Sequence, residues 1–156
     1  MVLFKLQGAK LFGRLSKCKF ALASVKFCGH VVYQHGVMPD PVKVKVVLDW
    51  PTPADVHQLR SFVGLAQYFR KFIQAFPDMI APLIALFKKG AGYNWSHACN
   101  IAFKQVKTAL TTAPCLKLPD PDESFTVITD ASGIGIGAVL MQSGRPVKML
   151  HLKDAS

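Results

Sequence analysis

The chain has 156 residues, 51% of them hydrophobic and 18% charged, a composition typical of a globular protein that excludes an intrinsically disordered one. Its 19 Lys and Arg against 9 Asp and Glu give a net charge of +10, which favours a polyanionic partner such as nucleic acid. No apolar run approaches the roughly 20 residues of a membrane-spanning helix, and no signal peptide is evident, so we expect neither membrane insertion nor secretion.

The positive charge is concentrated in the first two thirds of the sequence. Residues 1–39 contain six Lys and Arg and no acidic residue. This is also the composition of a mitochondrial transit peptide, although the stretch alternates like paired strands. We therefore expect an intracellular protein of the cytoplasm or the nucleus, with the mitochondrion as the alternative location.

The first 39 residues predict a short amphipathic helix followed by a β-hairpin. The helix is expected to end near Gly13. Apolar and polar residues then alternate with period two, which predicts strands over 16–21 and 25–33 and a turn near Ala23 and Ser24.

Four helices are predicted in the middle of the chain. The first covers residues 41–49, the second runs from a cap at residue 52 or 55 to about residue 76, the third covers 77–89, and the fourth runs from 96 to the break at Pro114. Asp40 and Pro41 suit the cap and the first residue of the first helix. Thr52 or Asp55 can cap the second helix, which is the longest. The third is short and bounded by prolines and glycines.

The longest predicted helix has a broad apolar face and, opposite it, a polar stripe at steps of four, three, four and three residues: Arg60, Gly64, Gln67, Lys71 and Gln74. Gly64 leaves the centre of this stripe without a side chain, and Tyr68 follows one turn later. A bare backbone beside an aromatic ring and several donors suits a duplex groove, where sugars and backbone atoms approach closely. The pattern equally allows Gly64 to admit a neighbouring helix while the donors face water.

The last third, from FTVITDASGIGIGAVL at 125–140 onwards, predicts a strand that carries a single carboxylate, Asp130, and then a second strand. A two-metal site needs several convergent carboxylates. Three acids of the preceding loop would lie at the other end of the strand, roughly 17–20 Å away for a strand of this length: Asp120, Asp122 and Glu123. With only Asp154 downstream, the alternative is that Asp130 caps a turn at Ser132 and Gly133.

Two other site patterns are weaker. Gly133, Gly135 and Gly137 lack the spacing of a dinucleotide-binding loop, and no helix follows them, so they predict a tight turn and a strand that another backbone approaches closely. The four cysteines do not have the spacing of a zinc site. One alternative is a metal site formed by Cys28, His30 and His35. Scattered thiols without a signal peptide predict reduced core residues.

The order of many short motifs resembles one family. The motifs are KCKF, VKFCGHVV, GVMPDPVKV, DWPTP, LRSFVGLAQYFRKFI, IAPLIALFKK, YNW, AFKQVKTALTTAPCLKLPD and FTVITDASGIGIGAVLMQ. Together, over roughly residues 10–148, they resemble the Pol polyprotein of gypsy-type long-terminal-repeat retrotransposons, across the junction of reverse transcriptase and ribonuclease H.

The resemblance implies an α+β fold in three parts. Residues 1–39 would end the reverse transcriptase palm with a primer-grip hairpin, residues 40–113 would form the thumb and connection helices, and residues 114–156 would form the first strands of a truncated RNase H-like domain. It implies nucleic-acid contacts from two groups of residues: Phe27, Gly29 and His30 of the hairpin, and Arg60, Gly64, Gln67, Tyr68 and Lys71 of the thumb. Asp130 would be the first metal-binding carboxylate of the nuclease, which uses Mg²⁺ in the intact parent enzyme.

The sequence also departs from the family pattern. Cys28 stands where family members usually have leucine, and the tail VKMLHLKDAS is atypical. The paired aspartates of the polymerase would precede residue 1, and the other acids of the nuclease would follow residue 156. We therefore expect a fragment that has no cofactor of its own and is inactive alone, but still binds an RNA–DNA or DNA duplex without sequence preference. The alternatives are a non-catalytic interaction module, such as a partner of an intact reverse transcriptase, or an enzyme completed by another chain.

Overall fold

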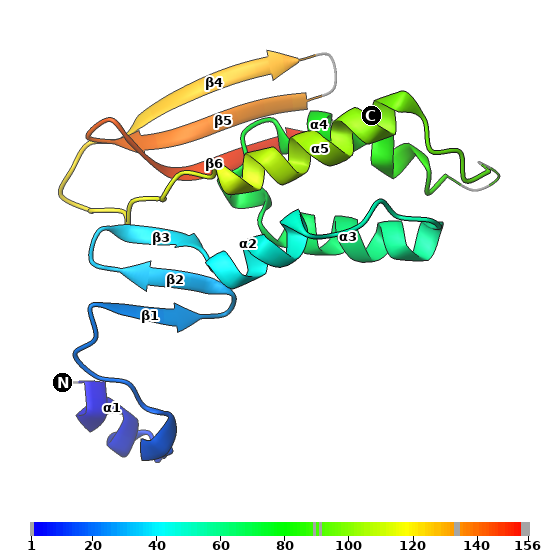
Figure 1. Ribbon diagram of the computed structural model, residues 1–156. Helices are drawn as coiled ribbons and strands as arrows, with labels where there is room; N and C mark the ends of the chain where they lie inside the picture. The colour runs from blue at the N-terminus through cyan, green and yellow to red at the C-terminus, as the bar shows by residue number, and fades with distance from the viewer. Residues whose placement is uncertain (1, 89, 91, 133–134, 154–156) are drawn as a thin grey trace.

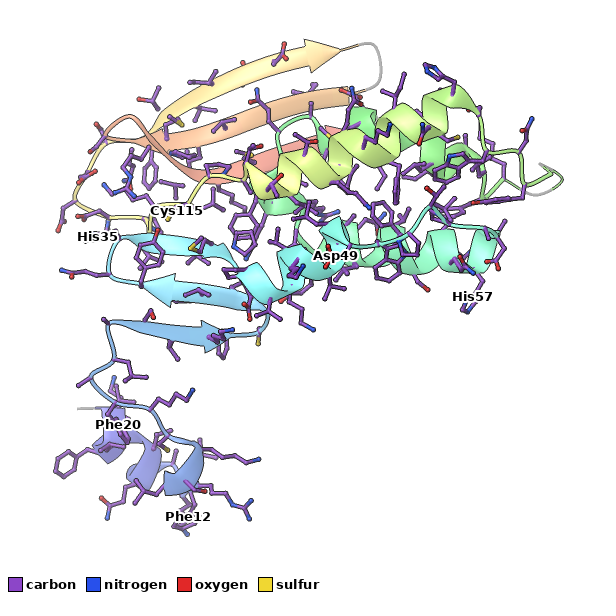
Figure 2. The ribbon with its side chains drawn as sticks, in the orientation of Figure 1. Phe12, Phe20, His35, Asp49, His57 and Cys115 are labelled. Carbon is purple, nitrogen blue, oxygen red and sulfur yellow. The ribbon has the colours of Figure 1, made fainter. Side chains whose placement is uncertain are left out.

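The computed structural model describes residues 2–88, 90, 92–132 and 135–153 and contains two three-stranded antiparallel sheets and a group of packed helices (Figure 1). The chain begins with α1 (Val2–Gly8) and the 3₁₀ turn η1 (Leu15–Lys17), which lie apart from the helical core, as do Phe12 and Phe20 in Figure 2. All residues from 2 to 28 are exposed. The predicted first helix is confirmed, but it ends at Gly8 and not near residue 13.

The first sheet consists of β1 (Ser24–Phe27), β2 (His30–Tyr33) and β3 (Gly36–Pro39), in that order. The predicted hairpin over 16–21 and 25–33 is therefore wrong in its position, since the turn lies at Cys28 and Gly29. Both turn residues have positive φ, 45° and 68°, as a two-residue type I′ turn requires. Such a turn does not interrupt the alternation of apolar and polar residues, so the pattern conceals it.

The helices are α2 (Pro41–Leu48), α3 (Val56–Tyr68), α4 (Phe76–Ala85) and α5 (His97–Thr111). Their caps follow local rules. Asp40 accepts from the amide of Val42 at 3.1 Å, and Asp55, not Thr52, caps α3 by accepting from the amide of Gln58 at 2.7 Å. Ser96 caps α5, which begins where the sequence predicts a helix.

The helix predicted to be the longest, α3, is shorter than predicted, and with 13 residues it is also shorter than α5, which has 15. It ends at Tyr68, and the chain continues through the 3₁₀ turn η2 (Arg70–Phe72) and a reversal at Ala75, where φ is 50°, before α4 begins. The buried residues of this stretch would also share one face of a continuous helix, which is why periodicity could not show the break: Phe69, Phe72, Ile73 and Phe76.

The hydrophobic core belongs mainly to these helices. Phe62 of α3 packs against Phe103 of α5 with ring centroids 4.6 Å apart. Other core residues are Val47, Leu59, Ala66, Phe69, Phe72, Ile80, Leu83, Ala102, Val106 and Leu110. With its apolar side held in this core, α3 presents its polar side to the surface. Among the described residues, no helix combines the length and hydropathy needed to cross a membrane.

The second sheet consists of β4 (Thr126–Ser132), β5 (Gly135–Gln142) and β6 (Arg145–Lys153). The predicted pair of strands is confirmed, and residues 145–153 add a third. Gly133, in the predicted turn capped by Asp130, and Asp154 lie outside the described residues. Every residue from 124 to 131 is exposed, so β4 is an uncovered edge strand in this chain.

A short segment joins the two sheets. Val37 of β3 and Leu116 exchange two backbone hydrogen bonds of 2.8 and 2.9 Å, and the amide of Lys117 donates to the carbonyl of Pro146 in β6 at 2.7 Å. Cys115 accordingly lies beside the first sheet in Figure 2. This close approach requires a glycine at position 36, because a Cβ there would lie 2.2 Å from the carbonyl oxygen of Leu116.

Candidate nucleic-acid interface

The centre of the polar stripe on α3 is open. Gly64 is exposed, and nothing in the described structure lies within 4 Å of the position that its Cβ would occupy. The alternative in which Gly64 admits a neighbouring helix is therefore contradicted. Arg60 and Gln67, one turn before and after, are also exposed. We call the exposed residues Arg60, Gly64 and Gln67 of α3, together with Lys71 of the turn that follows it, the α3 face.

The two cations of the α3 face rest on aromatic rings. The guanidinium carbon of Arg60 lies 5.6 Å from the ring centroid of Phe87, and Lys71 Nζ lies 5.2 Å from that of Phe72. Lys71 belongs to η2 and remains exposed beyond the end of the helix. Partial burial lowers the pKa of Lys71. These contacts limit the freedom of both side chains while leaving them accessible.

The hairpin turn between β1 and β2 meets the C-terminal end of α3. The hydroxyl of Tyr68 donates to the backbone carbonyl of Cys28, and its oxygen lies 3.3 Å from Nδ1 of His30. Phe27 is exposed at the start of the turn, whereas His30 is buried, with only 8% of its surface accessible. The structure thus brings Tyr68 of the second predicted group against Gly29 and His30 of the first, although their contacts with nucleic acid stay a prediction.

His30 occupies an apolar site between the hairpin and the end of α3 with the following turn η2. Its ring centroid lies 5.1 Å from that of Tyr68 and 5.6 Å from that of Phe72. Burial, and then the positive charge of Lys71, lowers the pKa of His30 below its ordinary 6.5, and contacts with the carbonyls of the turn offset part of this effect. Nε2 is buried without a hydrogen-bond partner in the described structure.

Asp40 forms a second connection between the hairpin and the helices. Its amide donates to the carbonyl of Gly29 at 3.1 Å, while its carboxylate caps α2 and accepts from Lys26 Nζ at 3.1 Å. The amide of Val42 and the ammonium of Lys26 lower the pKa of this carboxyl group. The turn is consequently held from two sides.

Asp130 lies on β4 opposite Gly137, two residues before the strand ends, and is exposed. Within the described ranges, no group of three or more His, Cys, Asp or Glu residues could hold a metal ion, whether around Asp130 or around the Cys28, His30 and His35 set. The loop acid Glu123 instead pairs with Lys117.

All four cysteines are free, as predicted. Their predicted location in the core is wrong for Cys18 and Cys28, which are exposed. Cys28 is exposed because it occupies a tight turn, and Cys18 because it follows the uncovered N-terminal helix.

Comparisons with known proteins identify the class of domain and then the kind of polyprotein. Residues 95–152 match the RNase H-like domain found in reverse transcriptase. The chain is 36% identical over 151 residues to the retrovirus-related Pol polyprotein from transposon 297 of Drosophila melanogaster, covering 96% of this chain and 14% of the polyprotein. It is thus a retrotransposon reverse transcriptase/RNase H-like fragment, and the predicted resemblance to gypsy-type Pol polyproteins is confirmed.

Further relatives support this identification. The Pol polyprotein from transposon gypsy of the same fly is 36% identical over 146 residues, with 86% of this chain and 14% of the polyprotein covered. The transposon Tf2-3 polyprotein of Schizosaccharomyces pombe is 35% identical over 141 residues, with 90% and 11% covered. The chain therefore spans only between about a ninth and a seventh of the length of these relatives.

Solved structures confirm the mixed α/β fold. A foamy viral protease–reverse transcriptase (dRH) in complex with double-stranded DNA matches with a TM-score of 0.80 at 22% identity, over 97% of this chain and 28% of that one. The foamy viral enzyme in complex with an RNA/DNA hybrid matches with a TM-score of 0.77 at 21% identity, over 91% and 20%. The division of the chain at residues 39 and 113 stays a prediction.

Proposed function

We propose that this chain binds RNA–DNA or DNA duplexes without sequence preference, through the α3 face and the adjoining hairpin turn. The observation that carries the proposal is the uncovered Gly64 among exposed donors. A helix without a side chain at one exposed position lets the sugar–phosphate surface of a duplex approach its backbone. The flanking Arg60, Gln67 and Lys71 can then donate to phosphate and sugar oxygens, which are the same for every sequence.

Charge and relatedness support the same function. The net charge of +10 favours a polyanion and gives an affinity that falls as salt is added. The foamy viral reverse transcriptases that share the fold have been captured on double-stranded DNA and on an RNA/DNA hybrid. Neither observation depends on the geometry around Gly64, so each is independent support.

The direct test is a salt titration of the 156-residue chain with a labelled RNA–DNA hybrid, measured by fluorescence anisotropy. The double variant Arg60→Glu with Lys71→Glu should weaken binding at least tenfold and reduce the slope of log K against log salt by about 1.8, for two lost phosphate contacts. The control, Lys104→Glu with Lys148→Glu, makes the same change in net charge at exposed positions on α5 and β6.

Two results would refute this proposal. One is undetectable binding of the unsubstituted chain at low salt. The other is an equal loss of affinity in the test and control variants, which would show that net charge alone attracts the duplex.

We also propose that Asp130 holds a divalent cation only together with acids from outside residues 1–156. One exposed carboxylate cannot supply the convergent oxygen ligands of a two-metal site, so these residues alone do not fit such a centre. The 156-residue chain with Mg²⁺ should leave the RNA of a hybrid uncut, and Asp130→Asn should change nothing. Cleavage that Asp130→Asn abolishes would contradict this. The predicted intact reverse transcriptase partner and the intracellular location stay predictions.

A further inference from the structure

The hydroxyl of Tyr68 forms a hydrogen bond within the protein. Tyr68 is the last residue of α3 and donates to the carbonyl of Cys28, 40 residues earlier. Its ring lies 5.1 Å from His30 and 5.0 Å from Phe69, centroid to centroid, in a tilted and an edge arrangement. Nearly half of the residue's surface, 46%, nevertheless remains exposed. The hydroxyl of a residue predicted to contact nucleic acid is thus already hydrogen-bonded to the hairpin turn.

The hairpin turn has a glycine, Gly29, where the ring of Tyr68 packs against it. A Cβ on Gly29 would lie 3.2 Å from Tyr68 Cε1 and 3.3 Å from its hydroxyl oxygen, closer than ordinary van der Waals contact. The φ of 68° at Gly29 independently disfavours a side chain. The φ of Cys28, whose carbonyl accepts the hydroxyl proton, is also positive at 45°. Turn conformation and tyrosine contact therefore depend on each other.

Counting protons assigns the contact with His30. A tyrosine hydroxyl has one proton, which goes to the carbonyl of Cys28. The 3.3 Å contact must then be a donation from His30 Nδ1–H to the tyrosine oxygen. This leaves Nε2, which is buried without a partner in the described structure, as the nitrogen without a proton. The result is a short relay from His30 through Tyr68 to Cys28.

We propose that Tyr68 and His30 are positioning residues that hold the hairpin turn, residues 27–29, beside the α3 face, and that the Tyr68 hydroxyl does not itself bind nucleic acid. The inference rests on the proposed function, because it explains how two segments far apart in sequence form one duplex surface. Fixing the turn before binding removes the ordering cost that a free turn would add.

Tyr68→Phe is the central test, since it keeps the ring and removes one oxygen. Amides 27–30 should exchange faster with solvent, and ¹⁵N NMR of the His30 ring should show loss of the pure Nδ1–H tautomer. Affinity for the RNA–DNA hybrid should fall about two- to tenfold, the range for one hydrogen bond. The matched control is Tyr93→Phe, whose hydroxyl donates to the Pro53 carbonyl at 2.6 Å, also 40 residues away. It should leave the tautomer and the affinity unchanged.

The outcomes separate the inference from the proposed function. Weaker binding by Tyr68→Phe with unchanged exchange and tautomer would overturn the inference, because the hydroxyl would then be a direct nucleic-acid contact. Faster exchange with unchanged affinity would overturn it as well, because the turn would not need positioning. If the unsubstituted chain binds no duplex, the proposed function fails, whereas the tautomer and exchange measurements still decide whether the relay exists.

Discussion

Replacing Gly64 should stabilise the fold and weaken duplex binding at the same time. Glycine inside a helix is about 0.8–1.0 kcal/mol less favourable than alanine. Gly64 is the ninth of the 13 residues of α3, and a Cβ there would meet nothing within 4 Å, so no steric term opposes the gain. Gly64→Ala should therefore raise the free energy of unfolding by about 1 kcal/mol, or the melting temperature by about 2–4 °C.

Affinity should move in the opposite direction. A single methyl group at the point of closest approach should weaken binding a few-fold. Gly64→Leu, which places a branched side chain of several ångströms on the α3 face, should weaken it at least tenfold, or about 1.4 kcal/mol. Leucine is also a good helix former, so this variant should retain most of the gain in stability.

The assay pairs thermal unfolding, followed by circular dichroism without nucleic acid, with anisotropy titrations on the RNA–DNA hybrid. Gln105→Leu is the control, because it places the same side chain at an exposed position of α5. Hybrid binding by Gly64→Leu that equals the unsubstituted chain would refute the contact. A melting temperature lowered by Gly64→Ala would refute the open helical environment itself.

Three further predictions concern stability. Because the pKa of His30 is lowered in the fold, the contribution of its neutral ring to folding stability is complete above the unfolded value of about 6.5 and is lost as pH falls from there through the lower folded value. Urea unfolding at pH 7.5 and 5.5 should show this loss, and His30→Gln should lack it. The effect should be smaller in Lys71→Gln, which removes the charge that faces the ring. Gly36→Ala should destabilise the fold by about 2–4 kcal/mol, since its Cβ would overlap the carbonyl of Leu116 and its φ of 149° disfavours a side chain. A free energy of unfolding for Gly36→Ala equal to that of the unsubstituted chain, measured by urea denaturation, would contradict the described contact between β3 and Leu116. Gln142→Leu should lower the free energy of unfolding by about 2–4 kcal/mol, because the buried Gln142 amide forms hydrogen bonds with three backbone groups of Asp120 and Glu123 in the preceding loop. An unchanged urea midpoint would show that water satisfies these backbone groups when the amide is removed.

Most of the helical part could be predicted from local signals. Asp40, Asp55 and Ser96 cap helices because a side-chain oxygen reaches amides two or three residues ahead, which needs no distant partner. The 3.6-residue period separated the buried side of α3 from the exposed one. Motif order along the chain was enough to identify the related polyproteins, which the comparisons confirm.

The amino-acid sequence by itself determined where helices begin, which side of α3 faces water, and the kind of polyprotein to which the chain is related. Only the tertiary structure decided that the hairpin turns at Cys28, that α3 stops at Tyr68 and that these two positions are bonded. The reason is that caps and periodicity act over a few residues, whereas a contact across 40 residues depends on how the whole core packs. Packing places the Tyr68 hydroxyl against the Cys28 carbonyl, and no local sequence pattern predicts this contact.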